Sequence, residues 1–77
     1  MRQQYVVGDY SYHATKEIIE MVNNNCDVDN ESRIPMIFGL NSMGWYIECL
    51  YKKDESRLEK HLKFILGLDW QTEINNV

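Results

Sequence analysis

One cysteine and two histidines in this 77-residue chain could supply a nucleophile and its base: Cys49, His13 and His61. A thiol enzyme needs a cysteine of lowered pKa with an imidazole within hydrogen-bond reach. Cys49 falls in an alternating apolar segment, where cysteine usually serves as a small apolar side chain. His61 borders a stripe of leucines, and His13 is far from both in the sequence. We therefore assign no catalytic residue and expect no enzymatic activity.

The spacing of the usual ligands does not favour a metal or nucleotide site. Residues 27–31 (Asp-Val-Asp-Asn-Glu) begin like a calcium loop. However, Ser32 stands where such a loop has glycine, and Phe38 where it has a bidentate glutamate. Cys26 has no cysteine or histidine two to four residues away, as a zinc site would require. The four glycines are scattered and form no phosphate-binding pattern, so we expect neither a metal ion nor a cofactor.

Charge is unevenly distributed along the chain. Eight Lys and Arg against twelve Asp and Glu give a net charge of −4 and a pI near 5.0. This balance disfavours a protein whose main task is to bind duplex DNA, because such a protein needs a cationic surface. Residues 17–32 contain five acidic residues and no basic one, and they give a first candidate surface. We call these residues the acidic set: Glu17, Glu20, Asp27, Asp29 and Glu31. It suits a protein partner with a basic surface.

Positive charge gathers closer to the C-terminus. Between residues 52 and 63, five basic residues stand against three acidic ones. Three of these five residues are spaced so that they share an outer helix face. We call them the basic stripe: Lys53, Arg57 and Lys60. A small nucleic-acid-binding accessory protein that uses this stripe, with tyrosines for base stacking, is the alternative function. Charged faces kept only for solubility are the competing interpretation of both charge clusters.

Tyrosines give a third candidate surface. The chain has five of them, besides two Trp and two Phe, and so small a core cannot enclose them all. Exposed tyrosine anchors protein interfaces because it brings a large, rigid contact area with a polar tip. The residues expected on such a surface, the aromatic set, are Tyr10, Tyr12, Tyr46 and Tyr51. A rim around the core is the competing interpretation.

The elements that must position these side chains follow from the apolar pattern. Residues 3–7 are rich in β formers and predict a first strand. Ser11 then stands as the N-cap of a helix over residues 12–25, which the asparagines at 23–25 are expected to end. The buried stripe of this helix is expected to comprise Ala14, Ile18, Met21 and Val22. Residues 23–33 have hardly any apolar content and predict a solvated loop.

A hairpin is predicted in the middle of the chain. Residues 34–40 are an apolar run, and Pro35 makes this run an edge strand or a strand that begins just after the proline. Residues 41–44 resemble a turn, and residues 45–52 alternate between two faces, as a second strand does. A helix over residues 43–53 is the alternative, which the aromatic and β-branched content disfavours.

The last helix has the clearest pattern. Ser56 and Glu59 fit a capping box, with Asp54 as the alternative cap. The expected buried stripe is Leu58, Leu62, Ile65 and Leu66. Gly67 follows as the stop signal, and residues 71–77 are expected to form a frayed tail.

The predicted architecture is one α+β domain over residues 1–77, in the order β-α-β-β-α, with two helices packed on one face of a three-stranded sheet. Two cysteines are too few for a disulfide scaffold, so we interpret both as thiols in a reducing compartment. The chain shows neither an apolar run of about 18 residues nor a signal-peptide pattern. We therefore expect a cytoplasmic protein with no membrane contact. A homodimer remains open as a way to supplement the small core.

The function expected from these observations is non-enzymatic binding of another macromolecule. A small acidic inhibitor or adaptor that acts by protein–protein interaction fits best. One concrete form is an inhibitor, encoded by a phage or mobile element, that occupies a basic nucleic-acid site on a host enzyme or defence system in the host cytoplasm. This expectation follows from size, charge and the lack of catalytic motifs, and not from resemblance to a family.

Overall fold

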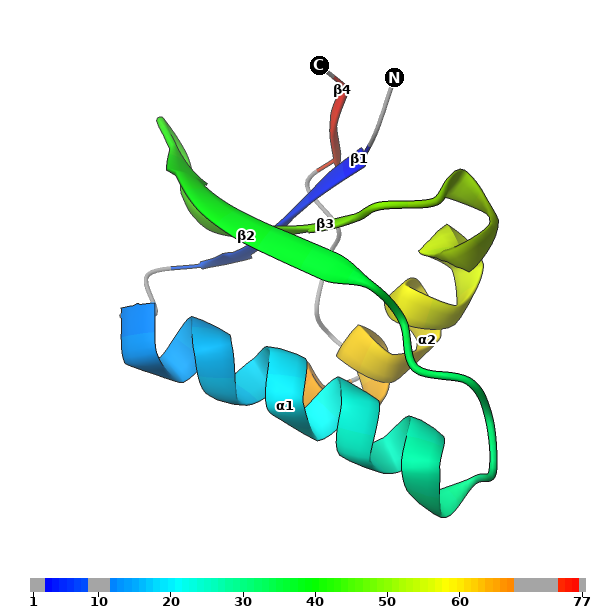
Figure 1. Ribbon diagram of the computed structural model, residues 1–77. Helices are drawn as coiled ribbons and strands as arrows, with labels where there is room; N and C mark the ends of the chain where they lie inside the picture. Colours follow the sequence, from blue (N-terminus) through cyan, green and yellow to red (C-terminus); the bar gives the residue numbers. More distant parts are fainter. Residues whose placement is uncertain (1–2, 9–11, 68–73, 77) are drawn as a thin grey trace.

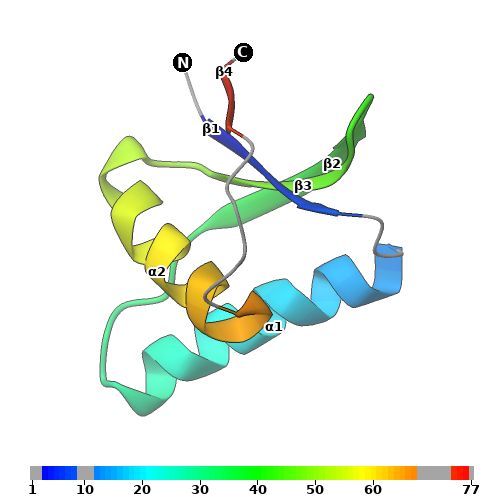
Figure 2. The ribbon, with the colours of Figure 1, turned by 180° about the vertical axis from the view of Figure 1, so that it is seen from behind.

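The computed structural model describes residues 3–8, 12–67 and 74–76. Its elements are β1 (Gln3–Gly8), α1 (Tyr12–Val28), β2 (Met36–Asn41), β3 (Gly44–Cys49), the short 3-10 helix η1 (Lys52–Asp54), α2 (Glu55–Leu66) and β4 (Ile74–Asn76). Both helices lie on one face of the sheet (Figures 1 and 2). The predicted α+β class and the order β-α-β-β-α are confirmed.

The sheet has the strand order β2-β3-β1-β4, with every neighbouring pair antiparallel. Strands β2, β3 and β1 are the three that the sequence predicts. The short strand β4 extends the sheet along the free side of β1, where Tyr5 pairs with Ile74. Within the tail expected to be frayed over residues 71–77, residues 74–76 are therefore paired with β1, and residues 71–73 and 77 lie outside the described residues. One isoleucine followed by two asparagines is too short a pattern to predict a strand, and the pairing depends on the open backbone edge of β1.

The predicted hairpin is confirmed, and the helical alternative is excluded. Strand β2 begins directly after Pro35, and Asn41 pairs with Gly44 across a two-residue loop. The Asn41 Oδ1 accepts a hydrogen bond of 2.8 Å from the Met43 N–H, and Gly44 has a φ of 121°, which favours glycine. The inward face of β3 carries Ile47 and Cys49, both buried as predicted.

Helix α1 buries a different stripe from the one expected. Its buried residues are Thr15, Ile18, Val22 and Cys26. Ala14 is only half-buried and Met21 is exposed, so the helix is rotated relative to the prediction. The buried residues keep helical spacing, but two of them are the small side chains of threonine and cysteine, which an apolar pattern underrates.

Helix α1 also runs further than predicted, because residues 23–25 continue it to Val28. It ends in the hydrogen-bond pattern of a Schellman motif: Glu31 N–H donates to Cys26 C=O (2.8 Å), and Asn30 N–H to Asp27 C=O (3.2 Å). Asn30 takes the left-handed conformation with a φ of 60°. An asparagine does end the helix, but not one of the expected three. The predicted cap Ser11 lies outside the described residues.

Helix α2 starts one residue after Asp54, which stands at the N-cap position without a capping hydrogen bond from its side chain. The expected capping box at Ser56 is not formed at this helix start. Leu58 and Leu62 are fully buried, Ile65 and Leu66 pack against the core, and Gly67 closes the helix, as predicted.

The first residue of α1, Tyr12, packs on the hairpin. Its ring centroid lies 5.3 Å from that of Phe38 and 5.6 Å from that of Trp45.

Candidate functional site

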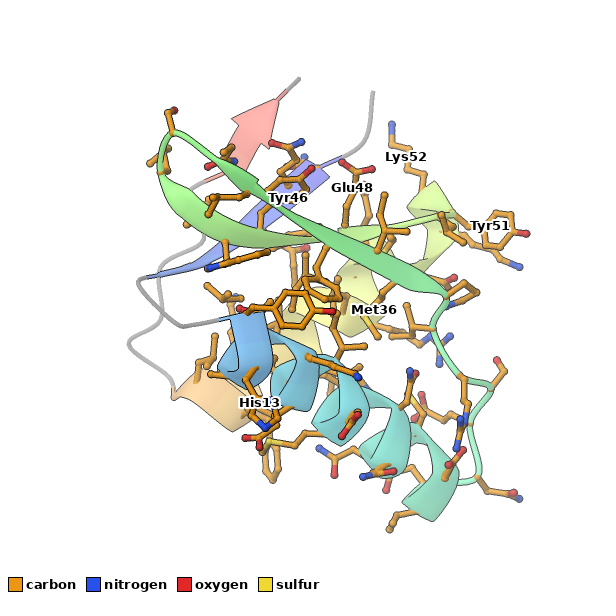
Figure 3. All side chains as sticks on the ribbon, turned by 60° about the vertical axis from the view of Figure 1, so that its left-hand side comes forward. His13, Met36, Tyr46, Glu48, Tyr51 and Lys52 are labelled. Carbon is orange, nitrogen blue, oxygen red and sulfur yellow. The ribbon has the colours of Figure 1, made fainter. Side chains whose placement is uncertain are left out.

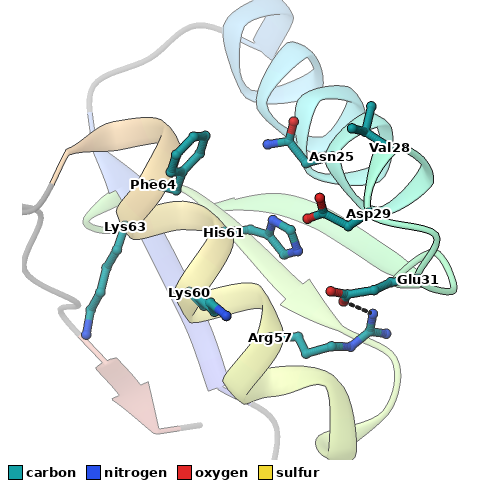
Figure 4. Close-up of a pocket in the computed structure, with 9 residues that line it drawn as sticks. All are labelled: Asn25, Val28, Asp29, Glu31, Arg57, Lys60, His61, Lys63 and Phe64. Atoms are coloured by element: carbon teal, nitrogen blue, oxygen red, sulfur yellow. Dashed lines mark hydrogen bonds and ion pairs between the residues drawn. The ribbon is translucent and has the colours of Figure 1, made fainter.

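A groove lies between the C-terminal end of α1 and the outer side of α2 (Figure 4). Its volume is about 900 Å³. The α1 side and the turn after it contribute Asn25, Val28, Asp29 and Glu31, and α2 contributes Arg57, Lys60, His61, Lys63 and Phe64. We call it the α1–α2 groove.

The rims of this groove carry the two most exposed large apolar side chains among the described residues. Val28 is 83% exposed and Phe64 is 79% exposed. Phe64 follows the buried Leu62 by two residues, which is about 200° around a helix, so it is turned away from the core. Val28 is the last residue of α1, and Figure 4 shows it on the opposite helix from Phe64. Apolar rims on both sides of a groove are typical of a binding surface.

The wall of the groove contains a thiol–imidazole contact that the sequence analysis did not consider. The Sγ of Cys26 lies 3.6 Å from Nε2 of His61, although 35 residues separate them. Burial raises the pKa of the Cys26 thiol. The charge of Arg57 lowers this pKa by a smaller amount, and neighbouring carboxylates raise it by a smaller amount. A raised pKa keeps the thiol neutral, which is the reverse of what a nucleophile needs.

The residues first considered for catalysis are not brought together. Cys49 is buried, and desolvation, reinforced by nearby carboxylates, raises its pKa to about 12. His61 contacts Cys26 instead of Cys49. His13 is exposed on α1, where its Nε2 lies 3.4 Å from Glu17 Oε1. The described structure therefore does not pair the thiol of Cys49 with either imidazole.

Two members of the acidic set form ion pairs with arginines of the same molecule. Asp27 accepts two hydrogen bonds from Arg33 (3.1 and 2.6 Å), which lower the pKa of its carboxyl. Glu31 accepts one from Arg57 (3.2 Å). Asp29 lines the groove, and the remaining members, Glu17 and Glu20, are exposed on α1. The acidic set is thus divided between internal ion pairs and accessible surface.

The basic stripe does not form a free surface either. Arg57 at its centre also donates to the Ser32 carbonyl (2.9 Å) and to the buried carboxylate of Asp54 (3.2 Å). Lys53 has its Nζ 5.5 Å from the ring centroid of Tyr51, and Lys60 lines the groove. Arg57 is thus engaged in contacts within the molecule, and the nucleic-acid alternative stays a prediction.

The aromatic set is spread over different parts of the molecule. Tyr12 packs with the hairpin on the helix-facing side of the sheet, whereas Tyr46 and Glu48 project from the opposite face (Figure 3). The Tyr46 ring covers Gly39 across the hairpin, and Tyr51 is exposed beyond the end of β3. Tyr10 lies outside the described residues. The described tyrosines therefore do not share one surface.

The sequence analysis missed Val28 and Phe64, the residues that characterise the groove best. Val28 stood in a segment expected to be a solvated loop. Phe64 could have been found, because it lies off the stripe formed by Leu58 and Leu62 and has to face solvent or a partner.

Neither a metal nor a membrane-spanning helix is indicated by the described part of the chain. There, His, Cys, Asp and Glu side chains form no group of three or more that could hold a metal ion. In the same residues, the helices are too short or too polar to cross a membrane. Comparison with protein-family models, curated proteins and solved structures finds no match to this chain.

Proposed function

We propose that this protein is a non-enzymatic protein-binding domain, of the inhibitor or adaptor kind, and that its α1–α2 groove receives an apolar segment of a partner protein. The observation that carries the proposal is the pair of exposed apolar rims, Val28 on α1 and Phe64 on α2. A side chain of this kind contributes about 1.5–3 kcal/mol when it is fully buried. An exposed phenylalanine beside a groove is therefore a strong candidate anchor for a partner.

The groove favours an elongated partner element such as an amphipathic helix. Both of its walls are helical, and a helix laid between two helices can bury one apolar stripe along its length. The volume of about 900 Å³ suits a few large side chains of such an element.

Charge around the groove supports a partner with basic residues beside α1. Glu17 and Glu20 are exposed on α1, and Asp29 lines the groove. On the other wall, Lys60 and Lys63 favour acidic residues in the partner. The proposed partner therefore has an apolar ridge with basic residues along one side and acidic residues along the other. Within the described structure, Asp27 and Glu31 are paired with arginines, so the members of the acidic set proposed to contact the partner are Glu17, Glu20 and Asp29.

The proposal is tested by capture of partner proteins from cells that naturally make this protein, with wild type and three variants. Phe64→Glu and Val28→Glu place a charge on each rim, and Tyr51→Glu places the same charge at an exposed aromatic residue outside the groove. We expect a protein that wild type and Tyr51→Glu retain and that both rim variants lose. Equal retention by all four proteins would contradict the groove as the binding site.

The charge requirement is tested separately with the double variant Glu17→Lys/Glu20→Lys. These side chains are exposed, and the contact of Glu17 with His13 is exposed as well, whereas reversal at Asp27 or Glu31 would also break an ion pair with an arginine. We expect the double variant to weaken binding of the captured partner, and added salt to weaken wild-type binding in the same way. Origin in a phage or mobile element, inhibition of a host nucleic-acid enzyme and a cytoplasmic location stay predictions.

A further inference from the structure

Strand β2 forms an edge of the sheet, since only β3 pairs with it in the described structure. It is six residues long and apolar, and it carries two well-exposed aliphatic side chains. Leu40 is 65% exposed and Ile37 is 42% exposed. An edge strand of this kind is a template for another strand unless the protein blocks it.

Alternate peptide groups of β2 point away from the sheet. Leu50 N–H donates to Pro35 C=O (3.1 Å), and the register continues with Ile37 opposite Glu48 and Gly39 opposite Tyr46. Since hydrogen-bonded pairs alternate along an antiparallel ladder, the peptide groups of residues 35, 37, 39 and 41 face β3. Those of residues 36, 38 and 40 therefore face outward, and no backbone hydrogen bond from them is seen within the described residues.

The usual devices that protect an edge strand are missing from this side of β2. Residues 34–47 contain no Asp, Glu, Lys, Arg or His. Pro35 offers no protection, because its peptide group faces β3 and not the outer edge. The other edge of the sheet differs, since its strand β4 has only three residues.

We propose that β2 pairs antiparallel with β2 of a second copy of this chain, giving a two-fold symmetric dimer with one continuous sheet. The two-fold axis passes beside Phe38, so that Phe38 lies opposite Phe38 and Met36 opposite Leu40 of the second copy. This register connects all the outward peptide groups of residues 36, 38 and 40 in hydrogen-bonded pairs.

The lack of charge favours a second copy over an unrelated strand. A self-pairing strand brings like residues close to each other across the axis, so charged side chains would repel there. The side chains also fit this register: Leu40 would be covered by Met36 of the second copy, and Ile37 would lie opposite Gly39. This surface is separate from the α1–α2 groove, so the dimer and the proposed function can fail independently.

Sedimentation equilibrium of the full chain, from micromolar to millimolar concentration, tests the dimer. We expect wild type to reach twice the chain mass of 9.2 kDa. The double variant Ile37→Lys/Leu40→Lys should stay at the monomer mass, and the groove variant Phe64→Lys should dimerise like wild type. Circular dichroism checks that every variant is folded. A wild type that stays monomeric, or a folded double variant that dimerises like wild type, would overturn the proposal.

Disulfide cross-linking tests the register. Both cysteine variants also carry Cys49→Ala, because Met36 lies opposite Cys49 on β3 and a cysteine at position 36 could form a disulfide with this native thiol within one chain. In this background, Met36→Cys/Leu40→Cys places cysteines about 5.5 Å apart between chains, measured between Cα atoms, in a geometry that a disulfide can span. Within one chain the two positions are about 13 Å apart along the strand and cannot be joined. We expect a covalent dimer on oxidation, which the single variant Met36→Cys should form far less. A non-covalent dimer that gives no cross-link in the double variant would overturn the proposed pairing.

Discussion

The guanidinium of Arg57 and the carboxylate of Glu31 form an ion pair of 3.2 Å, although 26 residues separate them in the sequence. The same guanidinium donates to the Ser32 carbonyl and to the buried carboxylate of Asp54. One side chain thus joins the start of α2 to the loop that follows α1, at one end of the groove (Figure 4). We infer that its main role is to hold the two walls of the groove in place.

Arg57→Ala should therefore destabilise the fold. The substitution leaves the Asp54 carboxylate buried without its cation, and Arg57 itself is about two-thirds shielded from solvent. We expect the free energy of unfolding to fall by about 1–3 kcal/mol, measured by urea denaturation. Lys60→Ala on the same helix is the control and should change it by less than about 0.5 kcal/mol. Equal effects of the two substitutions would contradict this role.

Gly39 and Tyr46 should be energetically coupled. A Cβ at position 39 would lie 2.7 Å from Oη and 2.9 Å from Cζ of the Tyr46 ring, so the ring would have to move. We expect Gly39→Ala to cost about 1 kcal/mol in wild type. In the Tyr46→Ala background the same change should be neutral or stabilising by about 0.5 kcal/mol, because alanine loses less backbone entropy than glycine on folding. Additive effects in this double-mutant cycle would show that the ring does not cover Gly39.

Both native thiols should be unreactive in the folded protein. Cys26 and Cys49 are buried, and burial raises the pKa of both thiols, that of Cys49 to about 12. We expect Ellman's reagent at neutral pH to titrate neither thiol in the native protein and both in denaturant. Tyr51→Cys supplies an exposed thiol as a positive control. Rapid reaction of a native thiol would contradict this prediction.

The parts of the fold that sequence patterns predicted best depend on local interactions. The hairpin follows from Pro35 before the strand and from a short turn between two apolar runs. Helix α2 follows from the spacing of Leu58 and Leu62 and from Gly67 as its stop. In each case, residues close together in the sequence determine the structure, so the pattern can be recognised without knowing the tertiary contacts.

The parts that could not be predicted depend on contacts between distant segments. Residues 74–76 become a strand because β1 offers them an open edge. Arg57 of the basic stripe and Glu31 of the acidic set form an ion pair with each other, so neither charge is free for a partner. Val28 becomes a rim of the groove because α1 continues to it, whereas the sequence placed it in a loop. Which charged and apolar side chains are available to a partner was therefore decided by tertiary structure.

The end of α1 gives a further prediction about the residue that closes it. Asn30 has a φ of 60°, a conformation that glycine adopts freely and alanine disfavours by about 1–2 kcal/mol. We expect Asn30→Ala to lower the free energy of unfolding by about 1 kcal/mol and Asn30→Gly to leave it nearly unchanged. Asn24→Ala is the control within the helix, where alanine should stabilise by a few tenths of a kcal/mol. Destabilisation by glycine as large as that by alanine would contradict this account of the helix end.

The Asp27–Arg33 ion pair should make stability depend on pH in the acid range. Hydrogen bonds from Arg33 lower the pKa of Asp27 in the folded protein below its ordinary value of 3.8. A carboxyl whose pKa is lowered by folding stabilises the native state above its unfolded pKa, which is about 3.9. That stabilisation is lost as the pH falls through the lower pKa of the folded state. We therefore expect Asp27→Asn and Arg33→Gln to lower the urea midpoint at pH 7, and the coupling between them in a double-mutant cycle to vanish in strong acid. Carbon NMR of the Asp27 carboxyl should show its titration below pH 3.8, and titration at or above that value would contradict the pairing.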